Sequence, residues 1–215
     1  MIRCEIFKAV CNTFNLFEGK VLDSGRVSMP YKELILSNPK ITEYVGLDIQ
    51  SALNYEDVKA DFLWDGIEMP FDNESFDVII STEVLEHVPN PDLYLQEVMR
   101  VLKPGGIFFF TVPFLQSLHE VHNDYYRYTP FALEMIFKRN GFIDIKINPM
   151  GGFHAAMVQM IGLLVNIYLW GRKKKFVEII AKPIMKLLYD NDKIPLHFKK
   201  STMIVGLSGP VIKPI

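Results

Sequence analysis

The stretch from residue 71 to residue 113 constrains the fold of this 215-residue chain more than any other part. It reads FDNESFDVIISTEVLEHVPNPDLYLQEVMRVLKPGGIFFFTVP. Two apolar runs, at 78–80 and 107–110, are typical of strands covered on both faces. The amphipathic segment between them begins with an N-cap and a proline at 90–91 and stops at the Pro-Gly-Gly of 104–106. Because a short-looped strand–helix–strand unit is parallel and right-handed, the stretch predicts an open α/β sheet.

Other segments continue this alternation of strand and helix. Further apolar runs flanked by turn signals predict strands at 20–23, 44–48, 58–62, 142–147 and 202–207. Capped or periodic segments predict helices at 1–18, 31–36, 129–140 and 153–190. About ten residues separate the second and third strands, which is too few for a crossover helix. We therefore expect a reduced loop at that point.

The composition is that of a folded protein, with 49% hydrophobic and 22% charged residues, and it predicts a single domain. Cys4 and Cys11 have neither metal-ligand companions nor a disulfide framework, which fits a reducing compartment. The first 20 residues contain several charges and no long apolar core, so we expect no signal peptide. These features predict a cytoplasmic protein.

The charge is unevenly distributed along the chain. The net charge is −2, but residues 151–215 carry ten basic and three acidic side chains. There, an apolar segment at 155–170 precedes the basic cluster 172–175, and it is shorter than the ~20 residues of a membrane span. The simplest interpretation is a helical insertion that packs on the domain, and a dimer face is an alternative. Basic residues beside Tyr168 and Trp170 are instead typical of a membrane surface.

The tail therefore predicts either packing on the domain or contact with the inner face of a membrane through residues 155–188. We predict no nucleic-acid partner, because the basic residues of the tail lack interleaved aromatic side chains and known binding motifs. The sequence does not define an oligomeric state.

Five motifs occur in a characteristic order: VLDSG (21–25), VGLDI (45–49), ADFLWDGIEMPFDNESFDVII (60–80), EVLEHVPNP (83–91) and RVLKPGGIFFFTVP (100–113). In order and spacing, the chain resembles the class I S-adenosylmethionine-dependent methyltransferases, in particular their small-molecule branch. The resemblance covers roughly residues 18–150. In one departure, Val27 and Met29 stand where the family's first loop usually has glycines, although Gly25 is kept.

The resemblance implies a doubly wound, mostly parallel, seven-stranded Rossmann-like sheet whose last strand is antiparallel. It also implies a single methyltransferase-like domain. Its core would comprise residues 18–150 and 201–208, and a helical, basic and apolar insertion would occupy about 153–195, before the last strand.

The resemblance also implies S-adenosylmethionine as the cofactor. Asp23, at the end of the first strand, would hold the amino group of the methionine part, and Asp48 would accept from both ribose hydroxyls. Asp61 would accept from the adenine amino group; the alternative for each carboxylate is an ordinary turn residue. The predicted cofactor-binding residues are Asp23, Gly25, Asp48, Ile49, Asp61, Phe62, Thr82 and Glu83.

A short helical turn after the fourth strand carries Glu83, Glu86 and His87. A similar set holds a divalent metal in some quinone-pathway members of the family. We predict no resident metal and keep these three residues as the candidate set. Other interpretations are that His87 is a general base, or that it caps the turn beside solvated glutamates.

The loop at 114–128 is rich in polar and aromatic residues and lies over the same sheet edge, so it is a candidate lid for the acceptor. Alternatively, its tyrosines pack on the domain and Arg127 pairs with Asp124. The catalytic candidates are His87, His119 and Tyr126.

The sequence thus predicts methyl transfer from S-adenosylmethionine to a small-molecule or lipid- or glycan-linked acceptor. The alternative is a catalytically inactive methyltransferase-like scaffold or binding subunit at a membrane surface, which the residues at 27 and 29 motivate. A nicotinamide-dependent reductase is disfavoured, because the glycines of its phosphate loop are missing.

Overall fold

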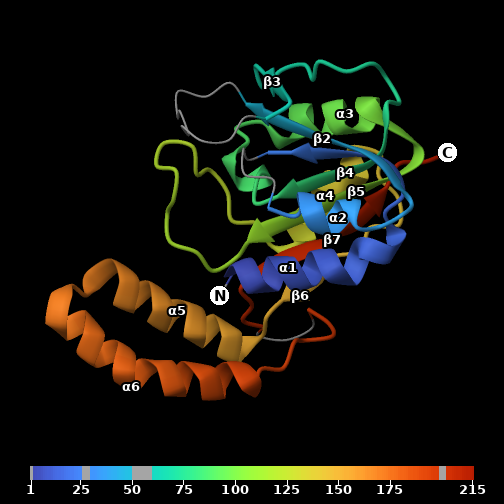
Figure 1. The fold of residues 1–215 in the computed structure, drawn as a ribbon. Coiled ribbons are helices and arrows are strands. Elements are labelled where there is room, and N and C mark those ends of the chain that lie inside the picture. Colours follow the sequence, from blue (N-terminus) through green and yellow to red (C-terminus); the bar gives the residue numbers. More distant parts are fainter. Residues whose placement is uncertain (1, 26–29, 50–59, 199–201) are drawn as a thin grey trace.

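A seven-stranded sheet forms the centre of the structure, a computed structural model that describes residues 2–25, 30–49, 60–198 and 202–215 (Figure 1). The strand order is β3-β2-β1-β4-β5-β7-β6. The strands are β1 (Gly19–Ser24), β2 (Ile41–Ile49), β3 (Phe62–Trp64), β4 (Phe76–Thr82), β5 (Leu102–Pro113), β6 (Asn148–Met150) and β7 (Gly206–Ile212). The helices and short 3-10 turns are α1 (Ile2–Thr13), η1 (Phe14–Leu16), α2 (Lys32–Leu36), η2 (Leu85–His87), α3 (Pro91–Val101), α4 (Pro130–Arg139), α5 (Phe153–Tyr168) and α6 (Gly171–Asp190).

The topology confirms the predicted fold class. Strands β1 to β5 pair in parallel, whereas β7 runs antiparallel to both of its neighbours. From β1 the chain builds outward to β2 and β3, and it then returns to place β4 on the other side of β1. In an open α/β sheet, ligands bind beyond the carboxyl ends of the strands at such a switch point.

Two apolar cores lie on opposite faces of the sheet, because successive residues of a strand point to opposite sides. Ile79 and Phe108 contribute to the core beneath α3 and α4. Val78, Ile80 and Phe109 contribute to the core beneath α1 and α2. The continuous apolar runs of the sequence are therefore explained by a sheet that is covered twice.

The predicted starts of α3 and α4 are confirmed. The Asn90 side chain accepts a hydrogen bond from the Leu93 backbone N–H, and Thr129 accepts one from Ala132 in the same way. In both helices proline occupies the first turn. Each cap satisfies a backbone donor that the helix leaves unpaired and contributes about 1 kcal/mol.

Three predicted strands are wrong in position. The strand expected at 58–62 begins at Phe62, so Asp61 precedes the strand instead of lying near its end. Residues 58 and 59 lie outside the described residues, as does the loop expected after the second strand. In place of 142–147, the edge strand is β6. Asp144, with a backbone φ of +46°, interrupts the extended chain there.

The last strand is the third correction, since β7 covers residues 206–212 and not 202–207. Gly209 and Pro210 resemble turn signals in the sequence. In the structure Gly209 is needed because the Lys146 carbonyl oxygen would lie 1.8 Å from an added Cβ. The close approach of a neighbouring segment thus explains a glycine within a buried strand.

The helices α5 and α6 form a hairpin that projects from the sheet domain (Figure 1). Residues 153–190 are helical as predicted, apart from the short break between the two helices. At the base of the hairpin, Asp192 accepts hydrogen bonds from the backbone N–H groups of Gly152 and Ala155. No residue of α6 is buried. Among the described residues, no helix combines the length and apolar character needed to cross a bilayer.

Candidate cofactor and acceptor site

The chain turns sharply where β1 ends. Gly25 has a φ of +111°, and its N–H donates to the Leu47 carbonyl oxygen at 2.9 Å. A Cβ at this position would lie 2.2 Å from Val84 Cγ2, so only glycine fits. Val27 and Met29, which stand where the family's first loop usually has glycines, lie outside the described residues.

Asp23 is a buried carboxylate with one oxygen left over. The Tyr44 hydroxyl donates to Oδ2 at 2.5 Å, whereas no described residue donates to Oδ1. Burial raises the pKa of Asp23 to about 7; the charge of Asp48 adds to this, and the Tyr44 hydrogen bond opposes it. A buried acceptor atom without a partner is costly, so this oxygen suits a ligand that brings its own donor.

The three predicted carboxylates gather on neighbouring strands. Asp23 lies beside Gly46 in the register of β1 and β2, and the Gly46 N–H donates to Asp61 Oδ2 at 2.7 Å. Asp48 lies two residues further along β2, half-buried, and its Oδ1 accepts from the Ile49 N–H. One oxygen of Asp61 is therefore already used to hold the backbone of β2.

Two apolar side chains flank these carboxylates. Ile49 and Phe62 are 46% and 45% exposed, so both offer apolar surface beside the carboxylates. Phe62 packs edge-on against Phe71, with ring centroids 5.0 Å apart.

A buried hydrogen-bond network connects the ends of β1 and β4. The Tyr94 hydroxyl lies 3.0 Å from Ser24 Oγ and donates to Ser81 Oγ at 3.0 Å. The sequence places Tyr94 in an amphipathic helix and Tyr44 at the start of a strand, and neither was a candidate site residue. Their apolar rings follow the pattern of a core, and only the three-dimensional register brings their hydroxyls to the polar strand ends.

The residues that follow this network are held in place. Thr82, the last residue of β4, is buried. Glu83 has a φ of +55°, a conformation that costs about 1–3 kcal/mol for a residue other than glycine. Its Oε1 accepts from the Thr111 hydroxyl at 3.0 Å, and its N–H donates to the Thr111 carbonyl oxygen. Such strain is concentrated at functional sites.

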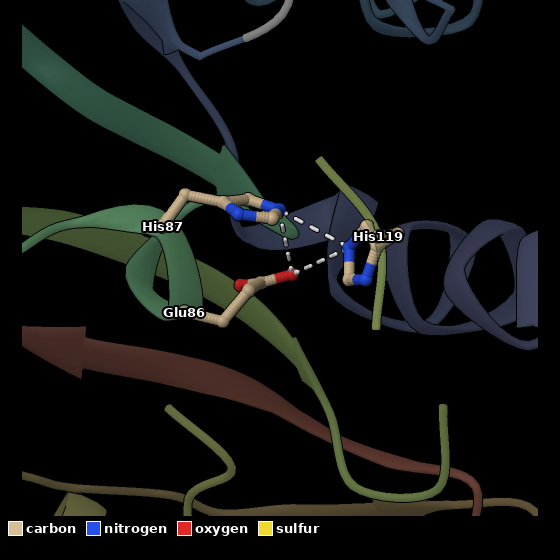
Figure 2. A group of neighbouring side chains, drawn as sticks. All are labelled: Glu86, His87 and His119. Atoms are coloured by element: carbon tan, nitrogen blue, oxygen red, sulfur yellow. Dashed lines mark hydrogen bonds and ion pairs between the residues drawn. The ribbon is translucent and has the colours of Figure 1, made fainter. Parts of the chain in front are cut away.

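Three side chains converge beside this edge, and we call them the histidine cluster: Glu86, His87 and His119 (Figure 2). The two Nε2 atoms are 3.1 Å apart. Glu86 Oε1 lies 3.7 Å from Nε2 of His87 and 3.9 Å from Nε2 of His119. Glu86 and His87 come from η2, and His119 comes from the loop after β5.

Backbone hydrogen bonds bring that loop to η2. The N–H groups of Tyr125 and Tyr126 both donate to the Glu86 carbonyl oxygen, at 2.8 and 3.2 Å. The buried Tyr128 hydroxyl donates to the Leu85 carbonyl oxygen at 3.1 Å. These contacts are non-local, which is why the sequence could list His87 and His119 as candidates but could not join them.

The outer ring nitrogens of both histidines are occupied. His87 Nδ1 lies 2.8 Å from the Asn123 carbonyl oxygen, which fixes the proton on Nδ1. His119 Nδ1 lies 3.4 Å from Asp124 Oδ2. The predicted pair of Arg127 and Asp124 is confirmed, with contacts of 2.5 and 2.7 Å, and it lowers the pKa of Asp124 to about 2.

The centre of the cluster is electrostatically unusual. Glu86 is 0% exposed, and no described residue hydrogen-bonds to either carboxylate oxygen. Burial raises the pKa of Glu86 well above its ordinary value, and the charge of Glu83 raises it further. Burial and the neighbouring His87 lower the pKa of His119.

The remaining candidates lie apart from this cluster. The Glu83 carboxylate, a member of the candidate metal set, turns to Thr111 instead, and His119 takes its place. The Tyr126 hydroxyl donates to the Pro89 carbonyl oxygen at 3.0 Å. A cavity of about 670 Å³ lies near Lys20 and Phe76, at the amino ends of β1 and β4, away from all of these groups.

Comparison with known proteins agrees with this geometry. Residues 28–110 match a family model described as a methyltransferase domain. This part of the chain is therefore similar to methyltransferase domains. The chloroplastic 2-methyl-6-phytyl-1,4-hydroquinone methyltransferase 2 of Oryza sativa subsp. japonica is 27% identical over 139 residues, which are 58% of this chain and 40% of that protein. The match therefore spans less than half the length of this relative.

Solved structures share the fold of the domain over almost its whole length. One is a putative methyltransferase of Haloferax volcanii in complex with the Trm112 methyltransferase activator: TM-score 0.60, 21% identity, 97% of this chain and 90% of that chain. Another is phosphoethanolamine N-methyltransferase 2 of Haemonchus contortus in complex with S-adenosyl-L-methionine: TM-score 0.60, 18% identity, 97% and 52% of the two chains.

Proposed function

We propose that this domain transfers the methyl group of S-adenosylmethionine to a small-molecule or lipid- or glycan-linked acceptor. The observation that carries the proposal is the unpartnered oxygen of buried Asp23, which lies beside Asp48 at the switch point of the sheet. The ammonium group and the ribose hydroxyls of S-adenosylmethionine would supply hydrogen-bond donors to these two carboxylates. The domain match and the rice relative support the same activity.

The cofactor supplies an electrophilic methyl group on a sulfonium sulfur, so the protein chiefly needs to align the reactants. In this proposal Asp23 holds the amino group and Asp48 holds the ribose. Ile49 and Phe62, both half-exposed, cover the adenine ring. Thr82 and Glu83, at the end of β4, then border the methyl group.

The histidine cluster lies on the acceptor side of the proposed site. Because His87 Nδ1 faces a carbonyl oxygen and carries the proton, its Nε2 can accept one. We therefore assign His87 as the base for an acceptor that must lose a proton. His119 is its neighbour, with the two Nε2 atoms 3.1 Å apart.

We also propose that the acceptor is presented at the inner face of a membrane, where the α5–α6 hairpin lies on the lipid. At the turn of the hairpin, Tyr168 and Trp170 are 70% and 78% exposed, and the basic cluster 172–175 follows. Each basic side chain close to an anionic surface contributes about 1 kcal/mol. Large apolar side chains of α6 are also half or more exposed: Phe176, Ile179, Ile180, Ile184 and Leu187.

The second candidate function is a binding scaffold without catalysis, which Val27 and Met29 favour because they replace expected glycines. Titration of the purified protein with S-adenosylhomocysteine separates the two candidates. Saturable binding that Asp48→Ala weakens at least tenfold supports the enzyme. An absence of saturable binding favours the scaffold, and an unchanged affinity in Asp48→Ala refutes the ribose assignment. Asp72→Ala, an exposed carboxylate outside the site, is the matched control.

A further inference from the structure

Both imidazoles of the histidine cluster present the same nitrogen to one point. Each Nδ1 faces an oxygen outside the cluster: Asn123 for His87, and Ser117 and Asp124 for His119. Such outer contacts keep the proton on Nδ1 and are typical of histidines that bind metal ions. The two Nε2 lone pairs then face each other across 3.1 Å. Two facing lone pairs repel unless a cation or a shared proton lies between them.

Glu86 adds a negative group to the same point. Its carboxylate is 0% exposed and has no hydrogen-bond partner among the described residues. A buried carboxylate of this kind must be neutralised, by a proton or by a cation. The arrangement of two imidazoles and one carboxylate satisfies the usual ligand preference of first-row divalent metals.

We propose that Glu86, His87 and His119 bind a divalent transition-metal ion such as Zn²⁺. Ligands at about 2.0–2.1 Å from a tetrahedral ion lie about 3.3 Å from one another. The cluster has edges of 3.1, 3.7 and 3.9 Å, so a small contraction around an ion completes the geometry. This set differs from the one suggested by the sequence, because His119 replaces Glu83.

Three protein ligands leave the metal with an open position, as in catalytic sites. The His87 and His119 side chains are 14% and 24% exposed, so a small ligand can reach the cluster from solvent. A catalytic role for the metal ion rests on the proposed function, whereas metal binding itself does not. When the ion is bound, His87 Nε2 is a ligand and no longer acts as the base; an acceptor hydroxyl on the ion would instead lose its proton to solvent more readily. Its oxygen then forms the C–O bond as the C–S bond of the sulfonium breaks, and the sulfur keeps the electron pair.

The test is a calorimetric titration of the chelator-stripped 215-residue chain with ZnCl₂, with metal content measured by elemental analysis. We expect one equivalent per chain, with affinity reduced at least tenfold in His119→Ala and in Glu86→Gln. Glu83→Gln tests the alternative set, and His154→Ala, a partly exposed histidine outside the cluster, is the matched control; both should bind as the unmodified protein does. Circular dichroism verifies that each variant is folded.

Two results overturn the inference: no stoichiometric Zn²⁺ binding, or binding that His119→Ala and Glu86→Gln leave unchanged. Titration of the same stripped and loaded samples with S-adenosylhomocysteine distinguishes this failure from failure of the proposed function. Nucleoside binding without metal binding removes only the metal site. Metal binding without nucleoside binding removes only methyl transfer.

Discussion

The Tyr44 hydroxyl donates a hydrogen bond to Asp23 Oδ2, and both side chains are buried between β1 and β2. This contact satisfies one carboxylate oxygen and leaves the other for a ligand. With a pKa of about 7, Asp23 is only partly ionised at neutral pH. A cationic ligand at this position must therefore compete with a proton.

The affinity for S-adenosylhomocysteine should rise with pH. Its ammonium group requires ionised Asp23, and with a pKa of about 7 roughly a tenth of the protein is ionised at pH 6. We expect about tenfold weaker binding at pH 6 than at pH 8, with proton release on binding. Calorimetry in two buffers of different ionisation enthalpy measures both effects. An affinity independent of pH, or the same pH dependence in Asp23→Asn, would contradict the assignment.

Asp23 should also make the ligand-free protein less stable at higher pH. Its pKa is raised from 3.8 to about 7 on folding, so between these values the folded state holds a proton that the unfolded state has lost. The free energy of unfolding from this group is greatest below about pH 4 and falls as pH rises to about 7. Urea denaturation at pH 5 and pH 8 should show a smaller difference in Asp23→Asn, whereas Asp72→Asn should retain it.

Gly25→Ala should destabilise the protein and weaken nucleoside binding. The new Cβ would lie 2.2 Å from Val84 Cγ2, and the φ of +111° is strained for alanine. We expect a loss of about 1–3 kcal/mol in the free energy of unfolding. Val84→Ala removes the clash but not the backbone strain. Gly25→Ala should therefore cost less free energy of unfolding in the Val84→Ala background than in the unmodified protein, but it should still cost some. Chemical denaturation of all three variants measures this.

The hairpin should bind anionic vesicles in a salt-dependent way. Lys173→Gln/Lys175→Gln removes two charges near the exposed Trp170, and at about 1 kcal/mol each this should weaken binding by more than tenfold. The control is Lys40→Gln/Lys138→Gln, a pair of exposed lysines elsewhere in the chain. Flotation with phosphatidylserine-containing vesicles at low and high salt checks this, because salt screens the attraction of basic segments to an anionic surface. Equal flotation of both double variants would refute the membrane proposal.

Much of the fold follows from local sequence. Asn90 and Thr129 start their helices as expected, because caps and proline act within one turn. The residue range of the last strand, β7, was harder to predict. It contains Gly209 and Pro210, which favour turns locally, and its place is decided by pairing with β5 and by the close approach of Lys146. Tertiary contacts override local preference there.

The candidate site was predicted in the same uneven way. The proximity of Asp23 and Asp48 follows from their places at strand ends, since parallel strands bring their carboxyl ends together, whereas their roles were implied by the family resemblance. The partnership of His87 with His119 depends on loop contacts across 32 residues, and no spacing in the sequence indicates it. Tyr44 was missed because its ring fits an ordinary core position while its hydroxyl performs the polar role.

The base of the hairpin touches the loop that carries His119. The Gln159 side chain on α5 donates to Gln116 Oε1 at 2.7 Å, three residues before His119. In Figure 1 the hairpin also extends toward the side where the arrows of β1 and β4 end. In the proposed membrane-docked state, a tilt of the hairpin would therefore move Gln116 and the loop that carries His119, and the proposed methyl transfer would differ between docked and free protein.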